Sequence, residues 1–409
     1  MLKLFLMKRF EKIGLAVPKV LLPKKNIDLK KWSVIACDQF TSDVQYWREV
    51  EDFVSDSPST LNLILPEIYL DKADKQERLE KINKTMKQYL QDGVLEEQGE
   101  GFVYVERQLS SGKVRKGLMV LIDLEQYDYY PDSVALMRAT EKTVIERIPP
   151  RVEIRKDASV EIPHIMVLVD DKNNEVFGQI KGEKELYNFE LMMDGGRVKG
   201  SLIESEMEME KIAENLEKLN RDGLLYAVGD GNHSLASAKE CWEKAKDEIM
   251  EMAESPDSFC NFLENSELRY VMVELVNLHD ESLEFEPIHR ILFDVDEADL
   301  REKIEGEDVD VEIISKGKIE KIKVVKNIRE VIDEYVQNHP EVKIDFVHER
   351  EKVIELAEGK NVGILMPAVD KKDLFNHVWQ SGPYPRKTFS MGDGKDKRYY
   401  VEARKIRKV

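Results

Sequence analysis

The sequence lacks the motifs that mark the most familiar nucleotide and metal sites. Its 409 residues contain no G-x-x-x-x-G-K-[ST] loop, no G-x-G-x-x-G fingerprint and no H-E-x-x-H pair, so common phosphate-loop, dinucleotide and zinc-protease classes are not indicated. The seven histidines are scattered singly, and we therefore expect no dedicated metal site. The three cysteines show no C-x-x-C spacing, which favours a reducing, cytoplasmic compartment over a disulfide framework.

Long apolar runs and an excess of basic residues are also missing. Without a run of transmembrane length, we expect no membrane partner. The net charge of −19 makes nucleic acid an unlikely partner, because general binding to DNA or RNA needs clustered cations. Charged residues make up 35% of the chain, mostly Lys and Glu. That bias is typical of a thermophile.

The hydrophobic pattern predicts an α/β protein, of α+β type with a mixed sheet, because hairpins alternate with amphipathic helices. Two hairpins are expected, one from 102–109 and 114–124, the other from 165–169 and 175–180. Strands are also expected at 32–37, 224–228 and 271–276. The length suggests two or three domains, and we place them at 1–125 (N-terminal α/β region), 126–295 (core) and 296–409 (C-terminal α/β region).

Residues 224–236, Leu-Leu-Tyr-Ala-Val-Gly-Asp-Gly-Asn-His-Ser-Leu-Ala, are the most informative segment. They predict a buried strand, a tight turn and the start of a helix, where unpaired N–H groups and the helix dipole favour an anion such as phosphate. The alternative is a helix start that a polar side chain merely caps. The candidate phosphate-binding or catalytic residues of this turn are Gly229, Asp230, Gly231, Asn232, His233 and Ser234.

A second candidate site lies in residues 138–151, Arg-Ala-Thr-Glu-Lys-Thr-Val-Ile-Glu-Arg-Ile-Pro-Pro-Arg. Arg138, Arg147 and Arg151 are candidate anion clamps, because guanidinium groups fit phosphate and carboxylate. Glu141 lies among them and is a candidate general base. The alternative, equally open, is a solvated helix with surface ion pairs.

Three further polar segments supply candidate substrate or phosphate contacts. Cys37 itself is a poor candidate nucleophile, because free cysteines are most often buried and inert. The contacts are Asp38 and Gln39 after the strand expected at 32–37, His289 and Arg290 in Glu-Pro-Ile-His-Arg, and Arg386 and Lys387 in Pro-Arg-Lys-Thr-Phe-Ser.

The segments already quoted, with Pro163-His-Ile-Met-Val-Leu and Leu275-Val-Asn-Leu-His-Asp, resemble domain of unknown function family 1015 almost from end to end. The Asp-Gly-x-His turn further resembles the signature of the ParB/sulfiredoxin-like superfamily. That superfamily includes nucleotide-dependent phosphotransferases, such as free-serine kinases, and DNA-partition proteins. The resemblance implies a ParB/sulfiredoxin-like core with additional N- and C-terminal α/β elements.

The resemblance also implies roles for individual residues. Asp230, Gly231 and His233 would hold nucleotide phosphates, and Glu141 would be the base toward a hydroxyl. Members commonly carry Arg after the His, where this chain has Ser234. Charge neutralisation would then have to come from Arg290, Arg386 or Lys387.

The leading hypothesis is a phosphotransferase that moves a phosphoryl group between a nucleotide and a small hydroxylated metabolite, with serine as one option. Its cofactor would be ATP or ADP with Mg²⁺, since Mg²⁺ needs only one or two carboxylates. The alternatives are a phosphatase acting on a phosphorylated metabolite and a nucleotide-binding, ParB-like regulatory protein. A homo-oligomer is compatible with the sequence.

Overall fold

The computed structural model describes residues 9–41, 43–253 and 255–407, and Ser42 of the polar loop falls outside them. The chain divides into two compact units. Unit 1 comprises Met1–Leu283, Val378–Gly382 and Asp393–Val409, and unit 2 comprises Glu284–His377 and Pro383–Gly392. The finer division at 125 and 295 stays a prediction.

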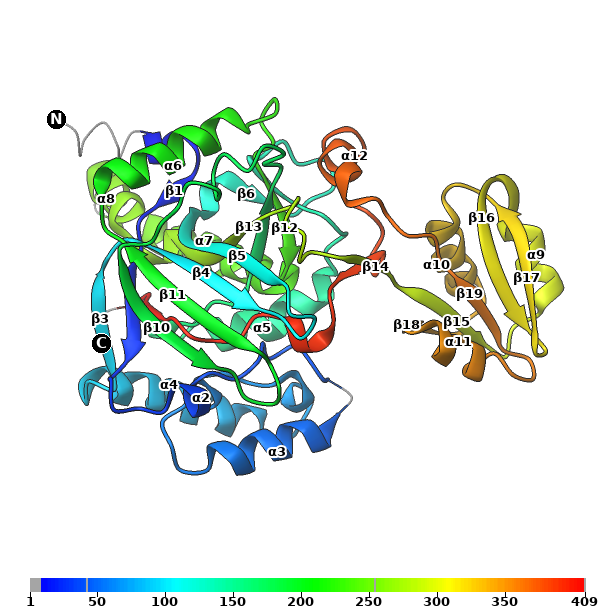
Figure 1. The fold of residues 1–409 in the computed structure, drawn as a ribbon, viewed down its shortest axis with the longest axis horizontal. Coiled ribbons are helices and arrows are strands. Elements are labelled where there is room, and N and C mark those ends of the chain that lie inside the picture. Colours follow the sequence, from blue (N-terminus) through cyan, green and yellow to red (C-terminus); the bar gives the residue numbers. More distant parts are fainter. Residues whose placement is uncertain (1–8, 42, 254, 408–409) are drawn as a thin grey trace. The chain divides into compact units, whose positions relative to one another are not determined.

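Unit 1 is built on a mixed sheet with the strand order β10-β11-β4-β5-β13-β9-β12-β7-β6 (Figure 1). Strand β9 runs parallel to β13 and antiparallel to β12, whereas β12 and β7 are parallel. The predicted α/β class with a mixed sheet is therefore confirmed. The strands are β1 (Leu15–Ala16), which pairs with β5, β4 (Phe102–Gln108), β5 (Val114–Asp123), β6 (Tyr127–Asp128), β7 (Met137–Ala139), β9 (Met166–Val169), β10 (Lys184–Glu190), β11 (Arg197–Ile203), β12 (Tyr226–Asp230) and β13 (Tyr270–Asn277).

Both faces of this sheet are buried, because alternate side chains of its central strands enter two different cores. In β4, Phe102 and Tyr104 belong to one core and Val103 and Val105 to the other. The helices of this unit are α2 (Leu29–Trp32), α3 (Val44–Val54), α4 (Lys75–Gln91), α5 (Ile148–Arg155), α6 (Glu206–Lys218), α7 (Asn232–Met252) and α8 (Pro256–Asn265). Short strand pairs join β2 (Lys19–Pro23) to β3 (Leu95–Glu100) and β8 (Val160–Glu161) to β21 (Arg404–Lys405).

Unit 2 has its own sheet and its own cores. The sheet order is β17-β16-β19-β15-β18, and helices α9 and α10 contribute to one core while α11 contributes to another. Its elements are β14 (Phe285–Pro287), β15 (His289–Phe293), α9 (Glu297–Ile304), β16 (Glu305–Ser315), β17 (Lys318–Val324), α10 (Ile328–Asn338), β18 (Lys343–Val347), α11 (Arg350–Leu356), β19 (Val362–Leu365) and β20 (Phe389–Met391). The division between the two units falls within α12 (Leu374–Ser381).

Short 3-10 turns connect several of these elements. Within the described ranges, no helix combines the length and apolar character that crossing a membrane would require. The 3-10 turns are η1 (Thr60–Leu63), η2 (Glu67–Tyr69), η3 (Leu124–Gln126), η4 (Ile145–Arg147), η5 (Glu267–Arg269), η6 (Lys371–Asp373) and η7 (Gly394–Asp396).

Two expected strands are wrong. Residues 175–180 form turns, because the Asp171 carboxylate accepts hydrogen bonds from the amides of Glu175 and Val176 and folds the chain back. Residues 32–37 contribute only an isolated bridge at Ile35, since Trp32 ends helix α2. The remainder of that segment is held by single hydrogen bonds to the C-terminal residues 398–400.

Candidate functional site

The turn between β12 and α7 forms the centre of the candidate site. Gly231 ends the turn with a left-handed backbone (φ +80°), a conformation that costs a residue with a side chain. A Cβ at this position would lie 3.0 Å from the Ile165 side chain and 3.1 Å from its Cα. Glycine is therefore needed here for two independent reasons, its backbone angle and its close approach to the neighbouring chain.

The first turn of α7 is open to an anion. The first helical hydrogen bond runs from the Leu235 amide to the Gly231 carbonyl, at 3.0 Å, so the amides ahead of it have no acceptor within the helix. In the described part of the chain, no side chain caps this helix. The Asp230 Oδ1 accepts from the Gly231 amide, at 3.0 Å, one position before the helix. An uncapped 21-residue helix presents a positive dipole end to a ligand.

Charged side chains from three distant segments meet beside this turn. The Lys397 Nζ lies 3.2 Å from the Asp230 Oδ2, with only 11% of the lysine side chain exposed. Burial raises the pKa of the Asp38 carboxyl, but the His164 ring, the Gln39 amide and the Lys397 ammonium outweigh it and hold the pKa below its usual value. The site thus combines one cation with two carboxylates.

A chain of hydrogen bonds ends at the hydroxyl of Ser234 in the first turn of α7. The Cys37 amide donates to the Tyr400 hydroxyl (3.1 Å), which lies 3.2 Å from His164 Nδ1, and His164 Nε2 lies 3.1 Å from the Ser234 Oγ. Burial, and then the neighbouring Cys37, raise the pKa of Tyr400 well above its usual value. The hydroxyl therefore stays protonated. The pKa of the Cys37 thiol is raised to about 12, chiefly by burial, as suits an inert cysteine.

His233 connects α7 to the loop that carries Glu141. Its Nε2 accepts a hydrogen bond from the Val144 amide, at 3.3 Å, and Thr140 donates to the Val228 carbonyl, at 2.6 Å. Glu141, which is half-buried, lies in the loop between Thr140 and Val144, the two residues that these hydrogen bonds hold. The geometry gives His233 a positioning contact with this loop.

The three arginines of residues 138–151 do not converge. Arg138 donates to the carbonyls of Ala135 and Gly223, near the start of β12 and away from the turn. Arg147 is exposed. Arg151 forms an ion pair with Glu67 and lines a cavity next to Ser234. The structure therefore brings only Arg151 near the first turn of α7.

The candidate residues of unit 2 form a cluster of their own. His289 Nδ1 accepts from the Met366 amide (3.1 Å), and Arg290 donates to the Ile288 and Arg386 carbonyls (2.8 and 3.3 Å). The guanidinium groups of Arg290 and Arg386 both lie over the Phe346 ring, and Lys387 follows with a left-handed backbone. The site described above is built from unit 1 without these four residues.

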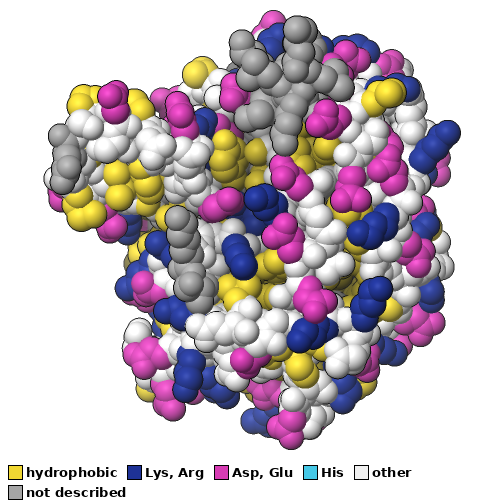
Figure 2. Space-filling view, turned by 90° about the vertical axis from the view of Figure 1, so that its left-hand side faces the viewer, with side chains coloured by type: hydrophobic (Ala, Val, Ile, Leu, Met, Phe, Trp, Pro, Cys, Tyr) yellow, Lys and Arg dark blue, Asp and Glu magenta, His cyan; other side chains and the backbone are white. Residues whose placement is uncertain are grey.

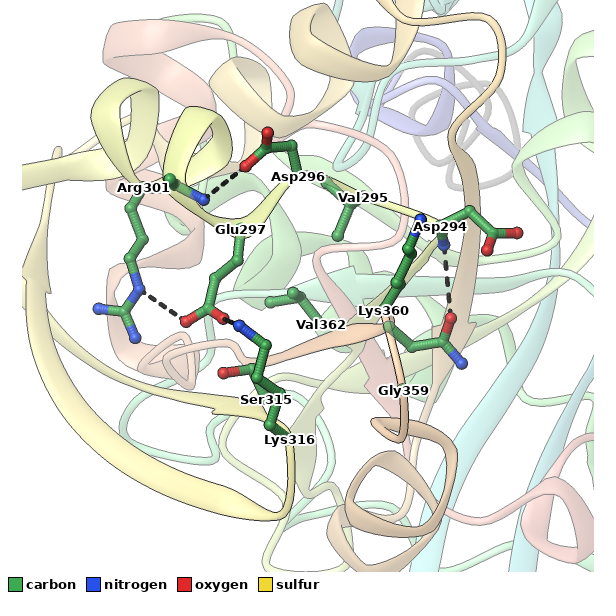
Figure 3. Close-up of a pocket in the computed structure, with 12 residues that line it drawn as sticks. Asp294, Val295, Asp296, Glu297, Arg301, Ser315, Lys316, Gly359, Lys360 and Val362 are labelled. Carbon is green, nitrogen blue, oxygen red and sulfur yellow. Dashed lines mark hydrogen bonds and ion pairs between the residues drawn. The ribbon is translucent and has the colours of Figure 1, made fainter.

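A larger cavity, of about 600 Å³, lies within unit 2, and two of its cations, Arg301 and Lys316, pair with Glu297 (Figure 3). Glu297 is held by Arg301 at 3.0 Å and by Lys316 at 3.3 Å, and Asp296 caps the first turn of α9. Elsewhere, acidic and basic side chains are interspersed on the face shown in Figure 2. The cavity in unit 2 is therefore a weaker candidate binding site than the uncapped turn of unit 1.

A family model described as "Protein of unknown function (DUF1015)" matches residues 21–406. The chain belongs to this family. The model spans the α7 turn, the Cys37 loop and the C-terminal segment that carries Lys397 and Tyr400. Every residue of the candidate site is therefore part of the DUF1015 match.

Comparison with individual proteins gives the DUF1015 chain only distant likenesses. No curated protein matches it. Solved structures that it resembles include free serine kinase in complex with AMP (11% identity, TM-score 0.37, 71% of this chain and 92% of that one). A second is a conserved hypothetical protein from Pyrococcus furiosus (13% identity, TM-score 0.34, 71% of this chain and 92% of that one). A third is C-terminally truncated SbnI from Staphylococcus aureus (10% identity, TM-score 0.36, 67% of this chain and 82% of that one). At these scores the likenesses do not bear on the chemistry of this chain.

Sequence reasoning missed three residues of the DUF1015 site: His164, Lys397 and Tyr400. His164 falls inside the Pro163-His-Ile-Met-Val-Leu segment, where family resemblance was the available signal. Lys397 and Tyr400 come from the C-terminal segment, more than 160 residues from Asp230. Only the fold brings them to the turn.

Proposed function

We propose that this chain is a nucleotide-dependent phosphotransferase that moves a phosphoryl group between a nucleotide and a small hydroxylated metabolite. The observation that carries the proposal is the uncapped first turn of α7 beside Lys397 and Ser234. Amide hydrogens, a hydroxyl and an ammonium are the donors that stabilise a transferring phosphoryl group. Serine remains one candidate acceptor.

In the proposed transfer, every bond formed is matched by a bond broken. The acceptor hydroxyl oxygen forms a bond to phosphorus, the bond from phosphorus to the leaving phosphate oxygen of the nucleotide breaks, and the hydroxyl proton passes to a carboxylate. Asp38 is our first choice for this base, because it interacts with Lys397 and His164 beside the proposed phosphoryl site. Glu141 is the second choice, held on the loop that His233 anchors. Ser234 and the α7 amides would hold the phosphoryl oxygens.

Magnesium that enters with the nucleotide would fit the same residues. The described ranges contain no group of three or more metal-ligating side chains, but Mg²⁺ bound through phosphates needs only one or two carboxylates. Asp230 would hold it. There it would supply neutralisation of phosphate charge.

The test is transfer from ATP or ADP to a panel of hydroxylated amino and hydroxy acids. Lys397→Met should lower kcat by about 10²–10³-fold, the usual loss for one donor to a developing charge. Lys395→Met is the matched control, because Lys395 is exposed two positions away, and it should leave kcat unchanged. Asp38→Asn and Glu141→Gln in the same assay assign the base.

Two results would overturn the proposal. One is the absence of nucleotide binding and of turnover with every acceptor. The other is phosphate release from phosphorylated acceptors in nucleotide-free buffer, which would favour the phosphatase. Salt-dependent retention on DNA would instead favour a ParB-like regulatory protein.

A further inference from the structure

Three side chains of unit 1 form a hydrogen-bonded series with the geometry of an activated serine. The Ser234 Oγ lies 3.1 Å from His164 Nε2, and the Tyr400 hydroxyl lies 3.2 Å from His164 Nδ1. A nucleophilic serine needs a hydroxyl, an imidazole within hydrogen-bond reach of it, and a third group that orients the ring through its other nitrogen. This Ser-His-Tyr series supplies all three.

The imidazole of the series is held in place on both sides. The side chains of His164 and Tyr400 are buried, and their two rings meet edge to face with centroids 5.5 Å apart. The Tyr400 hydroxyl is held in turn by the Cys37 amide, which donates to it at 3.1 Å. A buried ring with both nitrogens engaged cannot turn away without losing hydrogen bonds in the interior. His164 is thus oriented toward Ser234.

Ser234 is the hydroxyl of the series that a ligand can reach. It is half-buried and lines a partly open pocket of unit 1, whereas Tyr400 is enclosed. It is also the third residue of α7, whose first turn has no side-chain cap in the described part of the chain. The amides of that turn favour negative oxygen. They would therefore stabilise the oxygens of a phosphoryl group while the Ser234 Oγ attacks phosphorus.

The tyrosine of the series and the neighbouring cysteine are poor nucleophiles. Burial chiefly raises the pKa of the Tyr400 hydroxyl well above its usual value and the pKa of the Cys37 thiol to about 12. Neither group therefore ionises near neutral pH. A serine needs no ionisation in advance, because the base removes its proton during the attack. Ser234 is accordingly the candidate nucleophile.

We infer that Ser234 takes the terminal phosphoryl group of a nucleoside triphosphate onto its own oxygen when no acceptor is bound. This transfer rests on the proposed function, whereas the nucleophilic character of the hydroxyl does not. The Ser234 Oγ forms a bond to phosphorus, the bond from phosphorus to the bridging oxygen breaks, and the nucleoside diphosphate leaves with the electron pair. The hydroxyl proton passes to His164 Nε2, while the ring hydrogen on Nδ1 faces the Tyr400 oxygen.

Phosphorylation of Ser234 would close the site to a further nucleotide. The phosphate would occupy the first turn of α7 and bring a charge of about −1.5 to −2, which the helix amides and dipole stabilise. The phosphates of a second nucleotide would meet like charge at the same place. The modification should therefore stop at one phosphate per chain.

The first test uses a fluorophosphonate ester, which needs no nucleotide. The Ser234 Oγ should displace fluoride from its phosphorus, and peptide mass spectrometry locates the adduct. Ser234→Ala places a good helix former in α7, so it should fold, and it should abolish the labelling. His164→Gln should slow it by about 10²–10⁴-fold, the usual contribution of a general base.

Ser237→Ala is the matched control for both variants. Ser237 lies one turn further along α7, where its buried hydroxyl donates to the His233 carbonyl at 2.7 Å. The Ser237→Ala chain should therefore be labelled at the wild-type rate. Labelling that His164→Gln does not slow, or an adduct on another residue, would overturn the inference.

The second test incubates the full chain with ATP and Mg²⁺ without an acceptor. The intact mass should rise by one phosphate group and no further, and Ser234→Ala should show no rise. Labelling of Ser234 by the fluorophosphonate, with no phosphorylation by ATP and no transfer to any acceptor, would support the nucleophile and overturn the phosphotransferase. Transfer to an acceptor by a chain whose Ser234 neither reagent modifies would support the phosphotransferase and overturn the nucleophile.

Discussion

At the scale of single residues, Gly231 is the position where the site tolerates least change. In Gly231→Ala, the left-handed backbone and the contact with Ile165 should together lower the free energy of unfolding by about 2–4 kcal/mol. The same change should weaken phosphate binding, because the α7 amides would shift. Urea denaturation and phosphate titration measure the two effects.

Gly112 offers a matched control for that change. Its φ is +82°, close to the value at Gly231, but a Cβ there would meet nothing within 4 Å. Gly112→Ala should therefore cost only about 1–2 kcal/mol for the backbone conformation. Equal losses in the two variants would show that the close approach of Ile165 contributes nothing.

The residues that sequence reasoning reached are those close together in the chain. Asp230 and Ser234 lie on one strand-turn-helix, so their proximity follows from the glycines and the apolar pattern. Asp38 was expected as a contact from its polar loop, but nothing in the sequence relates it to Lys397 or His164. Contacts across hundreds of residues depend on the strand order, which spacing does not encode.

At the scale of elements, local patterns predicted β4, β5, β12 and α7 well, because alternation and helical periodicity were both clear. The hairpin expected at 165–169 and 175–180 failed for a local reason. The carboxylate of Asp171 binds two backbone amides and closes a turn, while β9 pairs with the distant strands β12 and β13 instead. Side-chain competition for backbone groups overrode the strand pattern.

A buried ion-pair network joins the C-terminal segment to strand β13. Arg398 pairs with Glu274 and Glu402, all nearly inaccessible, and its Nε donates to the Pro163 carbonyl at 3.1 Å. Burial raises the pKa of Glu274, but Arg398 and Arg115 outweigh it and lower the pKa below its usual value. Glu274 thus stabilises the fold above the ordinary glutamate pKa, about 4.3. That contribution is lost as the pH falls through the lowered pKa.

Arg398→Met should lower the free energy of unfolding by about 3–5 kcal/mol at neutral pH, because buried carboxylates lose their partner. In the variant, the pKa of Glu274 rises, so the folded state binds a proton more readily and the variant loses stability as the pH increases. The difference from the wild type should therefore shrink as the pH falls from 7 toward 5. Exposed Arg197→Met should change stability by less than about 0.5 kcal/mol; a pH-independent difference for Arg398→Met would contradict the assignment.

At the scale of the whole molecule, the two units have separate hydrophobic cores. Ile332 of α10 belongs to a core of unit 2, and Leu216 of α6 to a core of unit 1, and both are fully buried. Each unit can therefore unfold as its own cooperative transition. The candidate site and its cavity lie within unit 1, so a ligand of that site should stabilise that unit alone.

Scanning calorimetry of the full chain should accordingly resolve two transitions. Ile332→Ala should lower the free energy of unfolding of unit 2 by about 2–5 kcal/mol, as expected for a large-to-small change in a core. Leu216→Ala should do the same for unit 1. ADP at about 100 times its Kd should raise the free energy of unfolding of unit 1 by about 2.7 kcal/mol. It should therefore shift only the transition that Leu216→Ala also shifts. If ADP raised the Ile332-sensitive transition instead, the nucleotide would bind to unit 2 and the α7 turn would lose its proposed role. A single transition that responds to both substitutions would show that the units unfold together.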